Sequence, residues 1–316
     1  IQLGEVPAER VAVNYNALSS YGGVQLFPNK WRFYYDGGVA PHLVGYVTQI
    51  SQEELDEYLR RGYRQDERVG QTGIEKWGES YLAGTRGGTL YVFDAQGQPV
   101  YRLSQTQVKP SQAIFTTIDR DFQLGVQQAI AGFRGAVVVL ERDTGRVLAM
   151  ASSPGFDPNA FEPNNYNFST LLNEIFSDPS SPTFNRATQG QYPLGSVFKI
   201  VTMAAALDKG DYSLKDTLDC GYTYNVANTT LTDWTWEHFQ QDGKTQPSGV
   251  LTLPEGLIRS CNPWFYHIGQ DLFNRGLTNA IADMAKSFGL GAATGIGVVD
   301  EASGNVPVPN NVLDAT

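Results

Sequence analysis

Cysteine and histidine are scarce in this chain of 316 residues. The two cysteines, Cys220 and Cys261, neither require nor exclude an oxidising compartment. Whether they are bonded stays open at this point, and two buried thiols are the preferred interpretation. The three histidines (His42, His238 and His267) are scattered, and no cluster of His, Cys or Asp has the spacing of metal ligands. We therefore expect no metal and assign no cofactor.

Basic residues are in the minority, with 23 Lys and Arg against 33 Asp and Glu and a formal net charge of −10. This balance argues against nucleic acid as a partner. Long hydrophobic runs are also absent. The longest apolar runs, near residues 136–140 and 200–207, are too short to span a bilayer. Residues 1–10 lack the features of a signal peptide. Either the protein is soluble or an anchor lies outside this sequence.

The chain does contain enough apolar residues for ordinary cores, at 41% hydrophobic, and its length predicts about two domains. The polar stretch 104–112 is the expected boundary. Two helices are expected before this boundary, one from a capping box at Ser51 to about Arg61 and one over 74–83. Two strands are expected there as well, over 89–93 and 99–103. The elements expected after it are a helix over 121–131, a hairpin of strands 136–140 and 146–152, and a long surface loop over 153–185.

The most informative stretch is Ser196-Val197-Phe198-Lys199, at the start of an apolar segment that runs to about Leu207. A segment that is apolar all round predicts a buried helix, on which residues three apart are neighbours. Burial lowers the pKa of a lysine, and a neutral amine beside a serine hydroxyl is a general base beside a nucleophile. Pro193-Leu194-Gly195 places Ser196 at a helix N-terminus, where backbone N–H groups favour developing negative charge.

The alternative is an ordinary solvated serine and lysine. A Ser-x-x-Lys pattern arises by chance on the order of once in a chain this long. The apolar surroundings favour the catalytic interpretation, because buried lysines without partners are rare.

A second group of polar residues, Ser260-Cys261-Asn262, lies in a predicted tight connection between two helices. The first helix starts at the capping box Thr252-Leu253-Pro254-Glu255 and runs to about Arg259, and the second runs from about Pro263 to Arg275. Such a connection presents polar groups to a cleft, and Asn262 can hold a peptide amide through both its donor and its acceptor. The alternative is that serine and asparagine are common in turns, and Ser303-Gly304-Asn305 repeats the pattern.

Taken together, these pieces resemble class B penicillin-binding proteins, in the superfamily of serine transpeptidases and β-lactamases. The family's signature is Ser-x-x-Lys, then Ser-x-Asn, then Lys-Thr-Gly. The stretches that carry the resemblance in the second part are residues 115–119, 135–140 with 152–154, 192–199, 260–265, 288–291 and 294–296. In the first part, residues 42–47 and 70–75 resemble the family's N-terminal dimerisation (pedestal) domain.

The resemblance implies a D,D-transpeptidase that cross-links peptidoglycan outside the cytoplasmic membrane, anchored there in the intact protein. By position, Ser196 would attack the bond between two D-alanines of a stem peptide and Lys199 would take the proton. Ser260 would relay a proton to the leaving amine, and Asn262 would hold the peptide. β-Lactams would be trapped at Ser196. The implied partners are stem peptides, β-lactam antibiotics, a membrane glycosyltransferase of the SEDS type and other cell-wall machinery.

The resemblance also implies an α+β fold, in which an antiparallel sheet flanked by helices forms the transpeptidase domain. We expect a partial pedestal domain over 1–108 and a transpeptidase domain over 109–316. Lys-Thr-Gly does not occur, and the one Lys-Thr pair, in Lys244-Thr245-Gln246, precedes Ser260. We therefore expect a truncated form without the C-terminal strands, which acylates β-lactams slowly or not at all.

Two other functions stay open at this point. One is a class D-like β-lactamase, which would hydrolyse penicillin steadily and would need no pedestal. The other is a non-catalytic role, as a β-lactam sensor or as a scaffold for cell-wall machinery. The sequence does not distinguish a role in elongation from one in division, and it does not identify the acceptor amine.

Overall fold

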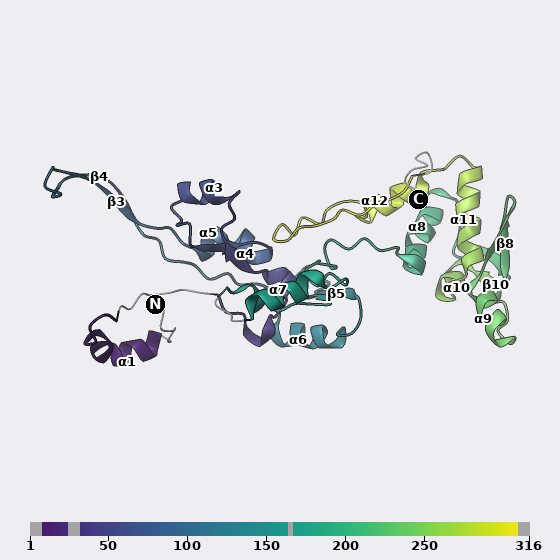
Figure 1. Cartoon of the computed structure of the whole chain (residues 1–316). Helices are drawn as coiled ribbons and strands as arrows, with labels where there is room; N and C mark the ends of the chain where they lie inside the picture. Colours follow the sequence, from purple (N-terminus) through teal and green to yellow (C-terminus); the bar gives the residue numbers. More distant parts are fainter. Residues whose placement is uncertain (1–7, 25–31, 164–166, 309–316) are drawn as a thin grey trace. The chain divides into compact units, whose positions relative to one another are not determined.

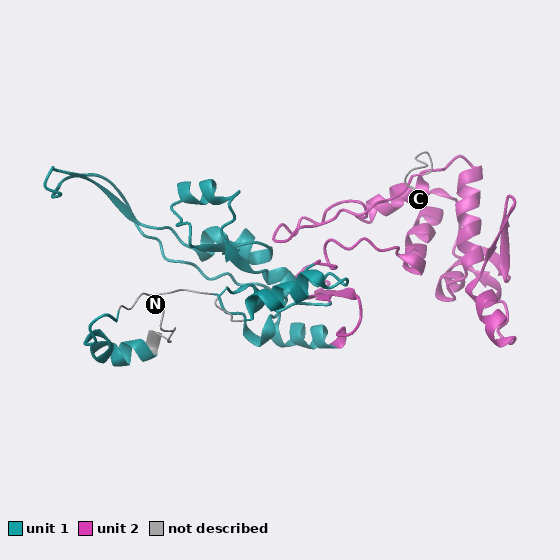
Figure 2. Ribbon diagram, viewed as in Figure 1, with its two compact units in different colours: residues 1–128, 154–183 teal, residues 129–153, 184–316 magenta. Residues whose placement is uncertain are grey.

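The computed structural model describes residues 8–24, 32–163 and 167–308. The chain divides into two compact units (Figures 1 and 2). Unit 1 consists of residues 1–128 and 154–183, and unit 2 of residues 129–153 and 184–316. Within the described ranges no helix is both long and apolar enough to cross a membrane.

Unit 1 contains short helices and two small antiparallel pairs of strands. The strand pairs are β1 (Val47–Gln49) with β2 (Arg68–Gly70) and β3 (Gly88–Phe93) with β4 (Pro99–Thr106). The helices are α1 (Ala8–Ser19), η1 (Tyr35–Gly37), α2 (Pro41–Val44), α3 (Leu55–Arg60), α4 (Gly73–Trp77), α5 (Glu79–Leu82), α6 (Arg120–Ala129), η2 (Pro158–Phe161) and α7 (Phe168–Ser177). Tyr58 of α3 packs with Tyr63 and Val69 in a small core.

Most elements expected in this part are confirmed, including the β3–β4 hairpin and α6. Ser51 and Glu54 do bond to each other, but α3 begins only at Leu55. The helix expected over 74–83 is two helices that meet at Gly78. The prediction of an irregular loop over 153–185 is wrong, because Asp157 caps η2 and α7 follows. The apolar residues of α7 recur at helical spacing, a pattern that the surrounding Pro and Asn residues obscured.

Unit 2 carries most of the apolar core. Its strand pairs are β5 (Gly135–Leu140) with β6 (Val147–Ser153), β7 (Thr217–Cys220) with β10 (Gly249–Thr252), and β8 (Thr223–Val226) with β9 (Thr229–Thr232), all antiparallel. Its helices are η3 (Gly195–Phe198), α8 (Lys199–Lys209), α9 (Trp234–Asp242), α10 (Leu253–Ile258), α11 (Asn262–Asn274) and α12 (Ala280–Ser287). Trp234 and Trp236 lie in α9, between the strand pair β8–β9 and strand β10.

The core of unit 2 lies between α8, α10, α11 and the strand pair β7–β10. Its fully buried members are Ala206, Cys220, Leu253, Cys261, Trp264, Ile268 and Leu272. Trp264 anchors this core, because its indole Nε1 donates to the carbonyl oxygen of Leu251 at 3.0 Å. The mixture of helices with antiparallel strand pairs confirms the α+β class.

The helix predicted to be buried on all sides is buried on one side only. Val201, Ala205 and Ala206 are buried where α8 packs against α11 and α12. Val197 and Ile200 are 67% and 50% exposed. A continuous apolar run predicts burial all round, but among the described residues of unit 2 the neighbours of α8 cover a single face.

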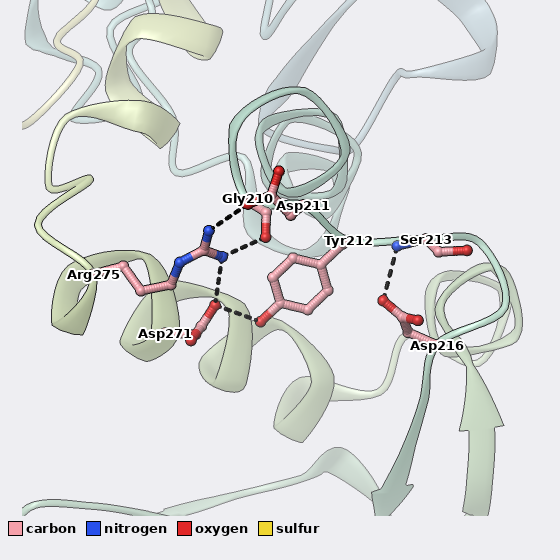
Figure 3. A network of polar contacts seen from close by, with 7 residues as sticks. All are labelled: Gly210, Asp211, Tyr212, Ser213, Asp216, Asp271 and Arg275. Atoms are coloured by element: carbon pink, nitrogen blue, oxygen red, sulfur yellow. Dashed lines mark hydrogen bonds and ion pairs between the residues drawn. The ribbon is translucent and has the colours of Figure 1, made fainter.

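A polar network joins the end of α8 to α11 (Figure 3). The guanidinium of Arg275 donates to Asp211 at 2.7 Å, to the carbonyl of Gly210, and to Asp271 at 3.4 Å. Tyr212 donates to the same Asp271 carboxylate at 3.1 Å, and burial together with that negative charge raises the pKa of its phenol. The network fixes the relative position of the two helices that carry the residues described next.

Candidate active site

Ser196 and Lys199 come from a short 3₁₀ turn and the helix that continues it. The turn begins at Gly195, whose φ of 56° is the left-handed conformation that glycine tolerates at little cost. Ser196 is exposed, whereas Lys199, the first residue of α8, is partly buried. The local sequence thus presents an accessible hydroxyl next to a partly desolvated amine.

The amine of Lys199 is held by the turn between α10 and α11. Its Nζ lies 2.7 Å from the carbonyl oxygen of Ser260, 3.0 Å from the Oγ of Ser260 and 2.6 Å from the Oδ1 of Asn262. It also lies 5.5 Å from the ring centre of Phe265, within the range of a cation–π interaction. An ammonium group has three donors, and these three oxygens can accept all of them.

Ser260 connects this amine to Ser196. The Ser260 Oγ lies 3.0 Å from the Ser196 Oγ and 3.0 Å from the Lys199 Nζ. Within the described part of the chain, no hydrogen bond joins Lys199 directly to Ser196, although their spacing makes them neighbours. Lys199 instead extends to the start of α11, where it finds three acceptors. The three side chains form one hydrogen-bonded series, Ser196–Ser260–Lys199.

The backbone around Ser260 has an unusual conformation. As predicted, Ser260 lies in a tight connection between two helices, α10 with its Thr252–Glu255 capping box and α11 with Pro263 in its first turn. The φ of Ser260 is 53°, which is uncommon for a residue with a Cβ atom. Such a conformation persists only where the surrounding structure holds it, and it is found most often at functional sites.

Asp233, which no sequence motif singles out, lies fully buried behind this turn. Its Oδ1 accepts the backbone N–H of Asn262 at 2.8 Å, and its Oδ2 accepts the backbone N–H and the hydroxyl of Thr235. The Asn262 amide also donates to the carbonyl of Thr232 at 3.3 Å. An aspartate just before α9 is recognisable as a helix cap. Nothing in the sequence shows that the same carboxylate also holds Asn262.

The charge state of Lys199 depends on this environment. Burial lowers the pKa of Lys199, and the negative charge of Asp233 opposes part of that shift. A lowered pKa increases the neutral fraction of the amine at neutral pH. A neutral amine has a lone pair and can accept a proton, so this arrangement can supply a general base that is connected to a hydroxyl group.

The preferred interpretation of the cysteines as two free thiols is wrong. Cys220 and Cys261 are fully buried, as expected, but they form a disulfide. They are 41 residues apart, and the pairing of β7 with β10 brings them together, a tertiary relationship that sequence spacing does not reveal. Their sulfurs and the Asp233 carboxylate lie within 4.8 Å of one another. In the disulfide neither sulfur is a thiolate, so the disulfide form does not offer a three-ligand metal site.

The Lys244-Thr245 pair has a local structural role. The backbone N–H groups of Lys244 and Thr245 donate to the Asp242 carboxylate at 2.8 and 2.9 Å, and the Thr245 hydroxyl does so at 2.7 Å. These hydrogen bonds lower the pKa of Asp242 to about 2. The pair therefore forms the turn that follows α9, where the Lys244 backbone rather than its amine makes the contacts.

Comparison with known families decides the classification. The family model described as "Penicillin binding protein transpeptidase domain" matches residues 135–316. This chain belongs to that family. The model "Penicillin-binding Protein dimerisation domain" matches residues 1–116. The boundary expected between residues 108 and 109 stays a prediction.

Curated relatives and solved structures of this transpeptidase family support the same classification. The chain is 32% identical over 317 residues to the Escherichia coli K12 peptidoglycan D,D-transpeptidase MrdA, a match that covers 96% of this chain and 46% of MrdA. A solved structure described as "Structural coordination of polymerization and crosslinking by a peptidoglycan synthase complex" matches with a TM-score of 0.75 and 28% identity, over 96% of this chain and 53% of that one. A Helicobacter pylori PBP2 in complex with MreC has a TM-score of 0.78 at 22% identity, over 96% and 54%, and shows the same fold. The chain spans about half the length of these relatives.

Proposed function

We propose that this chain carries the acyl-transfer site of a peptidoglycan D,D-transpeptidase, with Ser196 as nucleophile. The observation that carries the proposal is the hydrogen-bonded series from Ser196 through Ser260 to Lys199, with two links of 3.0 Å. The likeness to MrdA, a peptidoglycan D,D-transpeptidase, supports the same reaction.

In the first step the hydroxyl of Ser196 attacks the carbonyl carbon between two D-alanines. As the new C–O bond forms, the proton of Ser196 passes to the Oγ of Ser260, and the proton of Ser260 passes to the neutral amine of Lys199. Each transfer covers one of the 3.0 Å contacts, which is within the reach that general acid–base catalysis requires. Lys199 thereby becomes an ammonium ion, which the oxygens of Ser260 and Asn262 stabilise.

In the second step the C–N bond breaks and D-alanine leaves. The same series runs in reverse, so that the proton from Lys199 reaches the departing amine through Ser260. The acyl group stays on Ser196 until the amine of a neighbouring peptide attacks it. As the new C–N bond forms, a proton of that amine passes through Ser260 to Lys199, and it returns to the Ser196 oxygen when the C–O bond breaks. A β-lactam would enter by the first step, but its opened ring holds the leaving group in place, so the acyl-enzyme persists.

The remaining roles follow from position and from the relatives. Asn262 would hold the peptide amide through the second N–H of its side-chain amide and the second lone pair of its Oδ1, because its bonds to Thr232 and Lys199 use only one of each. The buried Cys220–Cys261 disulfide is typical of an oxidising compartment, which supports a site outside the cytoplasm. One solved relative belongs to a peptidoglycan synthase complex, which supports assembly with other cell-wall proteins, such as a SEDS-type membrane glycosyltransferase.

The test is labelling of the intact protein with a fluorescent penicillin, followed by mapping of the labelled residue. We expect a stable adduct on Ser196 of the intact protein and none in a Ser196→Ala variant, whereas the form without the C-terminal strands should be labelled slowly or not at all. Ser303→Ala is the matched control, because Ser303 belongs to the other Ser-x-Asn tripeptide and is exposed. Steady hydrolysis of penicillin without an adduct would instead indicate a β-lactamase. Cell-wall function that survives Ser196→Ala would indicate a scaffold or a sensor.

A further inference from the structure

The disulfide lies inside the candidate site. Cys261 is the residue between Ser260 and Asn262, and its partner Cys220 ends β7. Both sulfur-bearing residues are fully buried, so the bond is shielded from solvent. A covalent bond at this position restrains the backbone that carries two groups in contact with Lys199.

The disulfide closes a loop of chain that runs from β7 to the turn between α10 and α11. β7 pairs with β10, β10 continues into α10, and α10 ends at the turn that contains Cys261. The backbone N–H of Cys261 donates to the carbonyl of Gly256 at 2.9 Å. The disulfide then returns the chain from Cys261 to β7. The turn is thus restrained from α10, from β7 and, through Asn262, from the Asp233 carboxylate.

The restraints on this turn hold Ser260 in an unfavourable backbone conformation. A φ of 53° is unfavourable for serine, and the backbone would relax if its surroundings allowed it. Relaxation would move the Ser260 oxygens away from the Nζ of Lys199 and lengthen the contact with Ser196. Displacements of about 1 Å in a catalytic group can cost on the order of a hundredfold in rate.

We propose that the Cys220–Cys261 disulfide is a positioning element for the acylation step, which holds Ser260 and Asn262 against Lys199. This inference rests on the proposed function of Ser196. It makes the acylation rate dependent on the oxidation state of the protein. A dithiol such as dithiothreitol would supply two electrons and two protons, giving the thiols of Cys220 and Cys261 and an oxidised dithiothreitol ring. The two thiols occupy nearly the volume of the disulfide, so the fold can persist while the restraint is lost.

The experiment compares oxidised and reduced native protein, with the thiol content verified by alkylation and mass measurement. Labelling at several penicillin concentrations separates the acylation rate constant from the dissociation constant of the initial complex. We expect reduction to lower the rate constant about tenfold or more and to change the dissociation constant by less than about twofold. The melting transition should stay cooperative. The rise of the rate constant with pH should also move to higher pH, because a Lys199 amine that gains water recovers part of its ordinary pKa.

Two variants complete the design. Cys220→Ala removes the bond without changing the residue between Ser260 and Asn262, and it should behave as the reduced wild type does. The double variant with Cys220→Ala and Cys261→Ala controls for other effects of the reductant, because its rate should not respond to dithiothreitol. An equal rate constant in oxidised and fully reduced protein would overturn the proposal, and so would reduction that simply unfolds the protein. If oxidised wild type forms no adduct on Ser196, the proposed function itself fails.

Discussion

The Oγ atoms of Ser260 and Ser196 lie 3.0 Å apart, although the two residues are separated by 64 positions in the chain. Ser260 also lies 3.0 Å from the amine of Lys199. In the proposed mechanism the base Lys199 therefore connects to the nucleophile Ser196 through a second hydroxyl. That mechanism requires Ser260 for proton transfer during acylation. A role of Ser260 limited to the leaving group would not.

Replacement of Ser260 by alanine tests this relationship. The variant keeps Ser196 and Lys199 but removes the oxygen between them, so the proton of Ser196 has no path to the amine. We expect the acylation rate constant for a fluorescent penicillin to fall by about 10²–10⁴-fold, the usual contribution of general acid–base catalysis. Ser303→Ala should leave the rate unchanged. A rate in the Ser260→Ala variant close to that of wild type would show that Lys199 reaches Ser196 directly.

A second prediction concerns the pH dependence of acylation. In the proposed mechanism the reactive form of Lys199 is the neutral amine, so we expect the rate to rise with pH through the pKa of this group. Asp233 raises that pKa against the effect of burial. Asp233→Asn removes the negative charge but keeps an oxygen that can accept the Asn262 N–H. The pKa of Lys199 should then fall further, and the rise in rate should move to lower pH.

The control for this pH profile is Glu237→Gln. Glu237 is an exposed carboxylate in the same helix that Asp233 caps, and it makes no contact with Lys199 in the described structure. Glu237→Gln changes the net charge by the same amount as Asp233→Asn, but we expect it to leave the pH at which the rate rises unchanged. A shift in the Glu237→Gln variant as large as in Asp233→Asn would attribute the effect to net charge and would contradict the specific role of Asp233.

These predictions differ in how far the sequence alone supports them. Ser196 and Lys199 share one turn, and Ser260 and Asn262 share another, so contiguous motifs are enough to select all four. The direct contact expected between Ser196 and Lys199 is replaced by one through Ser260, because the Lys199 side chain finds better acceptors at α11.

The tertiary part of the site lies beyond what sequence patterns can predict. Asp233 and Cys220 act on the Ser260–Asn262 turn only because β7 and β9 pack against α11, and no local pattern encodes that proximity. Burial is predicted with mixed success for the same reason. The apolar run in α8 correctly indicates a core helix, but an apolar composition does not say which faces find a partner, and Ile200 stays exposed.

The Lys244-Thr245 pair provides a third prediction. Lys244 contributes its backbone N–H to the turn at Asp242, and Thr245 contributes both its backbone N–H and its hydroxyl. We therefore expect Lys244→Ala to leave penicillin labelling and thermal stability unchanged, whereas Thr245→Val should lower stability, because it removes the hydroxyl bonded to Asp242. The measurements are a labelling time course and a melting curve. A loss of labelling in Lys244→Ala would mean that this lysine serves the site as the Lys-Thr-Gly lysine of the family does.

The last prediction concerns the helix that delivers Ser260. Gly256 lies in α10 against the indole of Trp264, and a Cβ added there would meet the ring at 2.3 Å. Because both groups are buried, the clash cannot be relieved toward solvent. We expect Gly256→Ala to lower the free energy of unfolding by about 1–3 kcal/mol, the usual cost of overpacking. It should also slow labelling of Ser196, since a displaced α10 moves Ser260.

Gly269→Ala is the matched control, because Gly269 lies inside α11 and a Cβ there meets nothing within 4 Å. Alanine is the better helix former, so this variant should be more stable than wild type by about 0.5–1 kcal/mol. Denaturant titration of the two variants beside wild type, with penicillin labelling of each, separates the effects. If Gly256→Ala were as stable as wild type and labelled at the same rate, α10 would have to tolerate a shift against Trp264 without moving Ser260. The position of Ser260 would then be set by its bonds to Lys199 and Ser196 rather than by the packing of its helix.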